Sequence, residues 1–221
     1  IQTSSPSDIP DIYMLSGNGS ALALQDKKYY VPVQKFMDED NFDSSNIVAS
    51  LATNYTKDGA WQVLPWGYSN AGQFWNEDAL AKVGLKVEDM DSYEDILEAC
   101  GKLAAAGYKN FYGMYQLQHN DYLNYAMTAE GIDYCDNDNA RGGCPTKYLY
   151  MEDGACHDAA LSYFSFLREM IDRGYAANRK LSASDLFNGF AAGDILVVDS
   201  YVSRTATILD SVNGAFTVGY Q

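Results

Sequence analysis

The stretch WQVLPWGYSNAGQFW, residues 61–75, holds all three tryptophans of a 221-residue chain. Glycines, a serine and amide side chains stand between these rings. Aromatic side chains offer a broad apolar face, and amides beside them supply hydrogen-bonding groups. A packed core would distribute its widest side chains over several elements. The clustering therefore favours a surface on which flat rings meet a molecule from outside.

The residues that covalent chemistry needs do not form a recognisable motif. The sequence lacks a Gly-x-Ser-x-Gly elbow, a phosphate loop and a nucleotide-binding fingerprint. Its 30 Asp and Glu residues make pairs of carboxylates unavoidable, so they do not identify a glycosidase. Two histidines, His119 and His157, and no C-x-x-C spacing argue against zinc, and the DNDN segment lacks the glycine and glutamate of a calcium loop. We expect no enzyme, metal or other cofactor.

The composition is that of a globular protein with an acidic surface. Hydrophobic residues make up 47% of the chain, its formal net charge is -15 and its pI is about 4.3. Such a field repels phosphate backbones, so we expect no nucleic acid as a partner, and it disfavours strongly anionic ligands. No apolar run approaches the roughly 18–20 residues of a membrane span.

Four cysteines, Cys100, Cys135, Cys144 and Cys156, allow three connectivities. Cys135 and Cys144 flank a polar loop of a size that a disulfide could close, whereas Cys100 lies on a predicted helix and suits a buried thiol. Disulfides persist in oxidising compartments, so an extracytoplasmic location fits. The connectivity stays open.

Strands and helices are predicted to alternate, which indicates an α/β fold with a substantially parallel sheet. Expected strands are 12–15, 61–64, 109–117, 194–200 and 214–220, with a turn at Asp58-Gly59 before the second. Expected helices are 76–85, 91–107 capped by Ser92 and Asp95, 121–129, 157–173 and 184–192. The segment 29–37 is predicted to be irregular or an edge, and 132–156 a polar loop. The inward stripe of helix 157–173 is predicted as Leu161, Phe164, Leu167, Met170 and Ile171.

The order of three motifs resembles the extracellular solute-binding proteins of carbohydrate ABC transporters, of the maltose-binding-protein type. The first is KDGAWQVLPWGYSNAGQFWNEDALAKVGL, residues 57–85, in which Phe74-Trp75-Asn76 stands where an aromatic-aromatic-asparagine triplet opens a short helix. The second is the capped helix at 92–108. The third is the helix-glycine-strand unit at 186–204, where Ser200 and Tyr201 replace the usual glycine and tryptophan.

The resemblance implies a periplasmic-binding-protein-like two-lobe fold with mainly parallel sheets, incomplete at both ends. It assigns residues 1–70 to part of lobe one and residues 71–221 to most of lobe two. Upstream residues would be missing, and the protein would be associated with the membrane only through a missing anchor.

The resemblance also implies where a ligand binds, in a crevice between the lobes. Trp66, Tyr68 and Asn70 lie in the segment that crosses between lobes, and His119 stands where the family has a ligand-binding acid, which suggests an altered sugar specificity. Trp61, earlier on its strand, is expected in the core. The full set of predicted ligand contacts is Asn18, Trp66, Tyr68, Asn70, Trp75, Gln118, His119, Tyr122 and Tyr201.

The function implied is extracytoplasmic binding of a sugar or oligosaccharide by a monomer, which delivers it to an ABC transporter permease without catalysis. Aromatic rings would stack on the sugar, polar groups would bind its hydroxyls, and hinge closure would bury both. Two alternatives stay open: a ligand-binding sensor accessory to a membrane receptor, and a carbohydrate-active enzyme.

Overall fold

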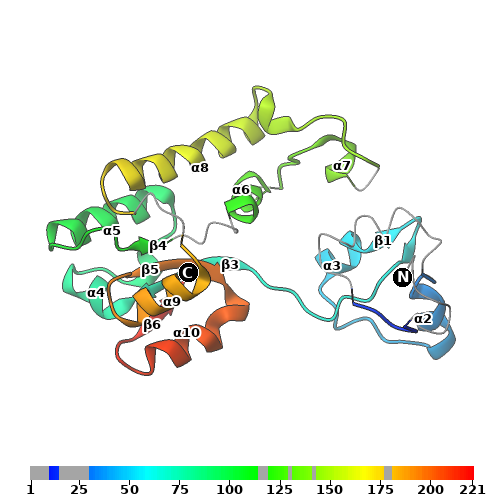
Figure 1. Cartoon of the computed structure of the whole chain (residues 1–221). Helices are drawn as coiled ribbons and strands as arrows, with labels where there is room; N and C mark the ends of the chain where they lie inside the picture. Colours follow the sequence, from blue (N-terminus) through cyan, green and yellow to red (C-terminus); the bar gives the residue numbers. More distant parts are fainter. Residues whose placement is uncertain (1–9, 15–29, 114–118, 129–130, 141–142, 177–180) are drawn as a thin grey trace. The chain divides into compact units, whose positions relative to one another are not determined.

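The computed structural model describes residues 10–14, 30–113, 119–128, 131–140, 143–176 and 181–221 (Figure 1). The chain divides into two compact units, Ile1–Tyr68 (unit 1) and Ser69–Gln221 (unit 2). The assignment of these units to lobes one and two stays a proposal.

The described part of unit 1 contains the short helices α2 (Gln34–Asp40) and α3 (Ala49–Asn54) and a β-hairpin of β1 (Thr56–Lys57) and β2 (Ala60–Trp61). The predicted turn is confirmed, since Asp58 and Gly59 have φ angles of 53° and 77° and connect the antiparallel strands. The buried Gln62 side chain supports the hairpin by donating to the carbonyl of Ala60 at 2.8 Å. Helix α2 corrects the prediction of an irregular segment there, because Pro32 lies before its N-cap, where no amide hydrogen is required.

Unit 2 is built on a four-stranded sheet in the order β4-β5-β3-β6. Strands β4 and β5 are parallel, whereas β3 runs antiparallel to both β5 and β6. The prediction of a mainly parallel sheet needs correction here, since alternation of strands and helices does not fix strand direction. The bounds are β3 (Ala71–Asn76), β4 (Tyr112–Gly113), β5 (Val197–Tyr201) and β6 (Val218–Tyr220).

The rest of the described part of unit 2 consists of helices and short 3-10 turns, several of which cover the sheet. They are α4 (Glu77–Lys82), α5 (Tyr93–Ala105), α6 (His119–Thr128), α7 (Asp136–Asn139), α8 (Ala155–Asp172), α9 (Ala183–Ala191) and α10 (Thr205–Val212), with 3-10 turns η2 (Val87–Asp89), η4 (Leu149–Met151) and η5 (Val202–Arg204). The predicted cap of α5 is confirmed, because the Asp95 amide donates to Ser92 Oγ at 3.1 Å. Helix α10 was not predicted.

The triplet at 74–76 ends strand β3 instead of opening a helix, which corrects the sequence prediction. Helix α4 starts directly afterwards, and Asn76 Oδ1 caps it by accepting from the amide of Ala79 at 2.9 Å. Successive strand residues point to opposite faces. Phe74 and Trp75 therefore enter two different core clusters, one on each side of the sheet.

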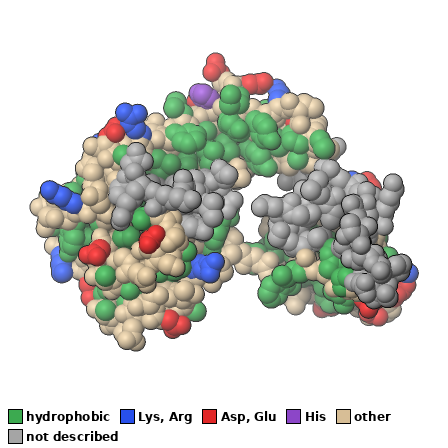
Figure 2. Space-filling model, viewed as in Figure 1, with side chains coloured by type: hydrophobic (Ala, Val, Ile, Leu, Met, Phe, Trp, Pro, Cys, Tyr) green, Lys and Arg blue, Asp and Glu red, His purple; other side chains and the backbone are tan. Residues whose placement is uncertain are grey.

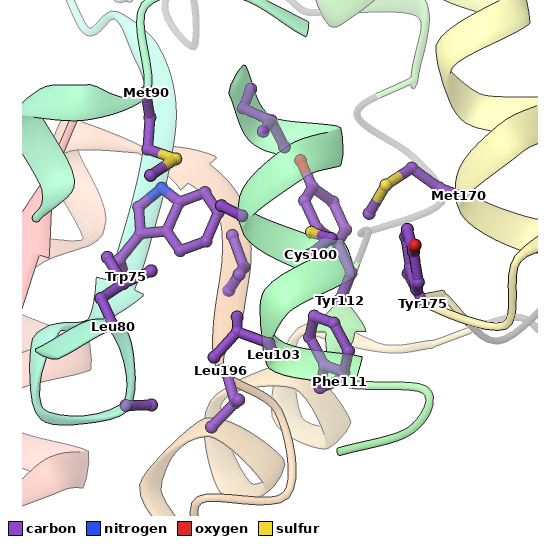
Figure 3. Packing of buried hydrophobic residues seen from close by; sticks show 14 of the residues in the cluster. Trp75, Leu80, Met90, Cys100, Leu103, Phe111, Tyr112, Met170, Tyr175 and Leu196 are labelled. Carbon is purple, nitrogen blue, oxygen red and sulfur yellow. The ribbon is translucent and has the colours of Figure 1, made fainter. Parts of the chain in front are cut away.

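Trp75 is completely buried and packs in the larger cluster with Leu80, Met90 and Leu196, as Figure 3 shows. Its indole N–H has no hydrogen-bond partner among the described residues. Cys100 is also fully buried, as expected of a packed thiol. The two aromatic residues of β3 thus serve the interior of unit 2.

Helix α8 confirms part of the predicted inward stripe, since Met170 is buried and Leu167 and Ile171 pack against the core. Its buried residues are Cys156, Ala160, Tyr163, Phe166 and Met170. Leu161 and Phe164, predicted to point inward, are 55% and 53% exposed, and Figure 2 shows hydrophobic side chains gathered along this helix. The two stripes are adjacent on the helix, and the packing against α5 and α6 selects between them. None of the described helices is both long and apolar enough to cross a membrane.

The predicted polar loop at 132–156 includes the short turn α7, where residues 137–140 all have positive φ angles. The Asp136 carboxylate accepts from the amide of Thr146 at 2.8 Å and from its hydroxyl at 2.5 Å. The described residues hold no cluster of three or more His, Cys, Asp or Glu side chains suited to a metal. Cys135 is buried and Cys144 exposed, and their connectivity stays a prediction.

Candidate functional site

Two segments of unit 2 lie side by side where strand β5 ends and strand β3 begins. Ala71 and Tyr201 are direct partners in the ladder, and the amide of Val202 donates to the carbonyl of Asn70 at 2.9 Å. The amide of Ser203 donates to Ser69 Oγ at 3.1 Å. We call these segments, residues 69–72 and 200–204, the β3–β5 edge. It brings together the predicted contacts Asn70 and Tyr201, 131 positions apart in the chain.

Helix α6 is attached to this edge by Tyr122. The Tyr122 hydroxyl acts as donor to two carbonyl oxygens. It lies 3.0 Å from that of Gly72 and 3.1 Å from that of Ser200. Burial raises the pKa of Tyr122, and the nearby Asp199 carboxylate adds to this effect. The structure therefore gives the Tyr122 hydroxyl a role in holding the two strand ends together, a role that the sequence did not indicate.

Behind the edge lies a buried polar group formed by Gln73, Tyr112 and Asp199. The Tyr112 hydroxyl donates to Asp199 Oδ1 at 2.7 Å, and Gln73 Nε2 donates to the same oxygen at 3.1 Å and also contacts the Tyr112 hydroxyl. Burial raises the pKa of Asp199 to about 7, and the hydrogen bonds from Tyr112 and Gln73 oppose that rise. Sequence reasoning missed this group, although an acid inside the apolar run DILVVDS is an unusual feature.

The Asp199 carboxylate also acts electrostatically on phenol groups of two helices. Burial and, as a smaller cause, the negative charge of Asp199 together raise the pKa of Tyr93 on α5 to about 12. Burial and then Asp199 also raise the pKa of Tyr163 on α8. Asp199 forms no ion pair with any described residue. Hydroxyl and amide donors, and not cations, therefore hold this carboxylate.

Trp66 and Tyr68, the last aromatic residues of unit 1, remain open to solvent. Their side chains are 86% and 61% exposed, and Tyr68 directly precedes Ser69 in the chain. Asn70 is also exposed, and Tyr201 is half-buried. These four predicted contacts are thus accessible for a ligand, each within its own unit.

The other predicted contacts have different outcomes. Trp75 is 0% exposed, so its ring cannot stack on a ligand, and we leave it out of the proposed site. Asn18 and Gln118 lie outside the described residues, and His119 begins helix α6 with a side chain that is not described.

Trp61, which was expected in the core, is half-buried and lines an open pocket of about 440 Å3 in unit 1. Two polar side chains of this pocket bind each other, because Gln34 donates to Asp38 at 2.8 Å, and Gln34 also accepts from the Trp61 amide at 3.2 Å. The pocket therefore offers few free hydrogen-bonding groups from these residues.

Comparison with known proteins decides the family. The whole chain, residues 1–221, matches the family described as bacterial extracellular solute-binding protein. The chain belongs to that family. The family is extracellular, which places this solute-binding protein outside the cytoplasm, and it consists of binding proteins, not enzymes. A comparison with curated proteins found no match.

Solved structures show the same fold. A chitin oligosaccharide binding protein aligns with a TM-score of 0.64 at 20% identity, over 86% of this chain and 46% of its own. The GacH receptor of Streptomyces glaucescens, solved with acarbose, aligns with a TM-score of 0.66 at 16% identity, over 91% of this chain and 49% of its own. The sugar-binding protein MalE of Xanthomonas citri aligns with a TM-score of 0.66 at 14% identity, over 86% of this chain and 46% of its own. This solute-binding protein spans about half the length of these structures. The predicted family and the periplasmic-binding-protein-like fold are confirmed, whereas the mainly parallel sheet is not.

Proposed function

We propose that this solute-binding protein binds a sugar or oligosaccharide outside the cytoplasm and, as a monomer, delivers it to an ABC transporter permease without catalysis. The observation that carries the proposal is the exposure of Trp66 and Tyr68 directly before the β3–β5 edge. The solved relatives support it, because one is a chitin oligosaccharide binding protein and another was solved in complex with acarbose.

The physical basis is stacking combined with hydrogen bonding. Sugar rings present apolar C–H faces, and covering them with the rings of Trp66 and Tyr68 yields roughly 25 cal/mol per Å2 of apolar surface removed from water. The exposed Asn70 amide can both donate to and accept from sugar hydroxyls, each bond contributing about 0.5–1.5 kcal/mol net. Rings and amide together can therefore distinguish a sugar from a purely apolar molecule.

The edge is fixed before a ligand arrives. The hydrogen bonds from Val202 to Asn70, from Ser203 to Ser69 and from Tyr122 to both strand ends hold its backbone. Preorganised groups lose less conformational entropy on binding, which improves affinity without additional contacts.

The same edge gives no support for hydrolysis. Glycosidases use two carboxylates beside the scissile bond, and residues 69–72 and 200–204 contain neither Asp nor Glu. The adjacent Asp199 is buried and bonded to Tyr112 and Gln73. We therefore propose binding without bond cleavage.

The test is calorimetric titration of the protein with a panel of neutral mono- and oligosaccharides. We expect Trp66→Ala and Tyr68→Ala each to weaken the best ligand by about tenfold or more, because each variant removes one stacking face. Phe164→Ala, which truncates an exposed aromatic residue on α8, is the matched control and should bind like the wild type. Unchanged affinity in both variants would refute the placement of the site, and a hydrolysed product would restore the enzyme hypothesis.

A further inference from the structure

The three arginines that the structure describes do not all have partners. Arg168 on α8 contacts Asp172 at 2.6 Å, and Arg173 contacts Glu169 at 2.6 Å, each at helical i,i+4 spacing. Arg204 forms no salt bridge with the described residues. The residues four before and four after it are Ser200 and Ile208, so the sequence provides no such local partner.

Arg204 is exposed and belongs to the β3–β5 edge. The neighbouring Ser203 amide is 3.1 Å from Ser69 Oγ, directly after Tyr68 in the chain. Among residues 66–72 and 200–204, Arg204 is the only one with a charged side chain. Within unit 2, a single cation therefore belongs to the same β3–β5 edge as Asn70 and Tyr201, two residues that are proposed to hold a sugar.

Folding does not explain an arginine at this position. Arg204 is the N-cap of helix α10, and its side chain makes no capping hydrogen bond there. Arg204 also ends the 3-10 turn η5, so the dipoles of η5 and α10 act on its charge in opposite senses. Its closest acid in sequence, Asp199, is buried and engaged by Tyr112 and Gln73. The Arg204 side chain thus forms neither a capping hydrogen bond nor an ion pair with the described residues.

We infer that Arg204 is a specificity-determining residue that selects sugars carrying a carboxylate, namely oligosaccharides that contain a uronic acid. This inference rests on the proposed function. The guanidinium group presents a planar fork of N–H donors that matches a carboxylate with two parallel hydrogen bonds. Stacking rings and an exposed amide bind the sugar body, and Arg204 recognises the acid group.

The net charge of -15 is compatible with one carboxylate on the ligand. At physiological ionic strength, charges further than about 8 Å from a ligand are largely screened, whereas a direct ion pair is not. The acidic surface disfavours ligands with many charges, so the inferred class carries a single carboxylate.

The experiment compares matched ligands by calorimetry on the protein and three variants. Each pair consists of a neutral disaccharide and its uronic acid counterpart, for example cellobiose and cellobiouronate. We expect the acid member to bind the wild type about tenfold more tightly or better, and Arg204→Met to abolish that preference while changing neutral-sugar affinity less than about twofold. Arg204→Lys should retain part of the preference, and Arg168→Met, the control at a distant exposed arginine, should retain all of it.

The outcomes separate this inference from the function on which it rests. Suppose that neutral sugars bind and that Trp66→Ala weakens them. If the uronic acid member of each pair then binds the wild type no more tightly than the neutral member, or if Arg204→Met keeps the preference for the acid, only the role of Arg204 is refuted. If the wild type binds neither member of any pair, both the function and the inference are refuted.

Discussion

Gln73 and Asp199 lie directly opposite each other in the β3–β5 ladder, and the Gln73 amide donates to the Asp199 carboxylate at 3.1 Å. The two residues are 126 positions apart in the chain. Their interaction joins the first strand of unit 2 to the strand that carries Tyr201, directly behind the β3–β5 edge.

The protonation of Asp199 should make stability depend on pH. Burial raises its pKa from 3.8 to about 7, so the folded protein binds this proton more tightly than the unfolded chain. The resulting stability is fully present below pH 3.8 and is lost as the pH rises through about 7. Between pH 5 and 8.5 we expect a loss of about 2–3 kcal/mol in the free energy of unfolding, measured with urea. Asp199→Asn should flatten this part of the profile, and an unchanged slope in that variant would contradict the assignment.

The two tryptophans at 66 and 75 should respond to truncation in opposite ways. Trp75→Ala opens a cavity in the core and should lower the free energy of unfolding by about 3–5 kcal/mol. Trp66→Ala removes an exposed ring and should change it by less than about 0.5 kcal/mol. Urea denaturation of both variants provides the comparison. A large loss in the Trp66 variant would show that this ring supports folding and is not kept for a ligand.

Removing the Tyr122 hydroxyl should weaken the attachment of α6 to the sheet. Tyr122→Phe leaves the carbonyls of Gly72 and Ser200 without this donor, and we expect a loss of about 1–2 kcal/mol in the free energy of unfolding. Tyr108→Phe is the control, because the Tyr108 hydroxyl makes no hydrogen bond to a described residue. Equal stability of the two variants would disprove the attachment.

Two glycines near the proposed site should tolerate a methyl group very differently. A Cβ at Gly72 would lie 2.5 Å from both the Gln221 carbonyl oxygen and the Tyr220 hydroxyl, whereas one at Gly67 would meet nothing within 4 Å. We therefore expect Gly72→Ala to cost about 1–3 kcal/mol and Gly67→Ala to be nearly neutral in urea unfolding. A stable Gly72→Ala variant would mean that β3 and the segment after β6 separate more easily than their hydrogen bonds indicate.

Local signals allowed parts of this fold to be predicted from the sequence. The Ser92 cap and the Asp58-Gly59 turn depend on residues close together in the chain, and the structure confirms them. The family that the motifs indicated is confirmed by the match over residues 1–221. The exposure of Trp66 and Tyr68 agrees with the surface role that their neighbours suggested.

Features that depend on distant residues were not predictable in this way. The direction of β3, the burial of Trp75 and the bonding of Tyr122 are set by which strands and helices pack together. The buried Asp199 group needs Gln73 and Tyr112 from two other strands, and nothing in the local sequence pairs them. Strand pairing over more than a hundred residues is decided by the packing of the whole unit.

The unequal burial of the tryptophans also gives the protein built-in optical probes. Trp75, fully shielded, should emit at short wavelength and resist quenching by iodide, whereas Trp66, 86% exposed, should emit at long wavelength and be quenched readily. Fluorescence can therefore follow the core and the exposed aromatic segment separately in one unlabelled sample. A bound sugar should protect the long-wavelength emission of Trp66 from quenching by iodide and leave the short-wavelength emission of Trp75 unchanged.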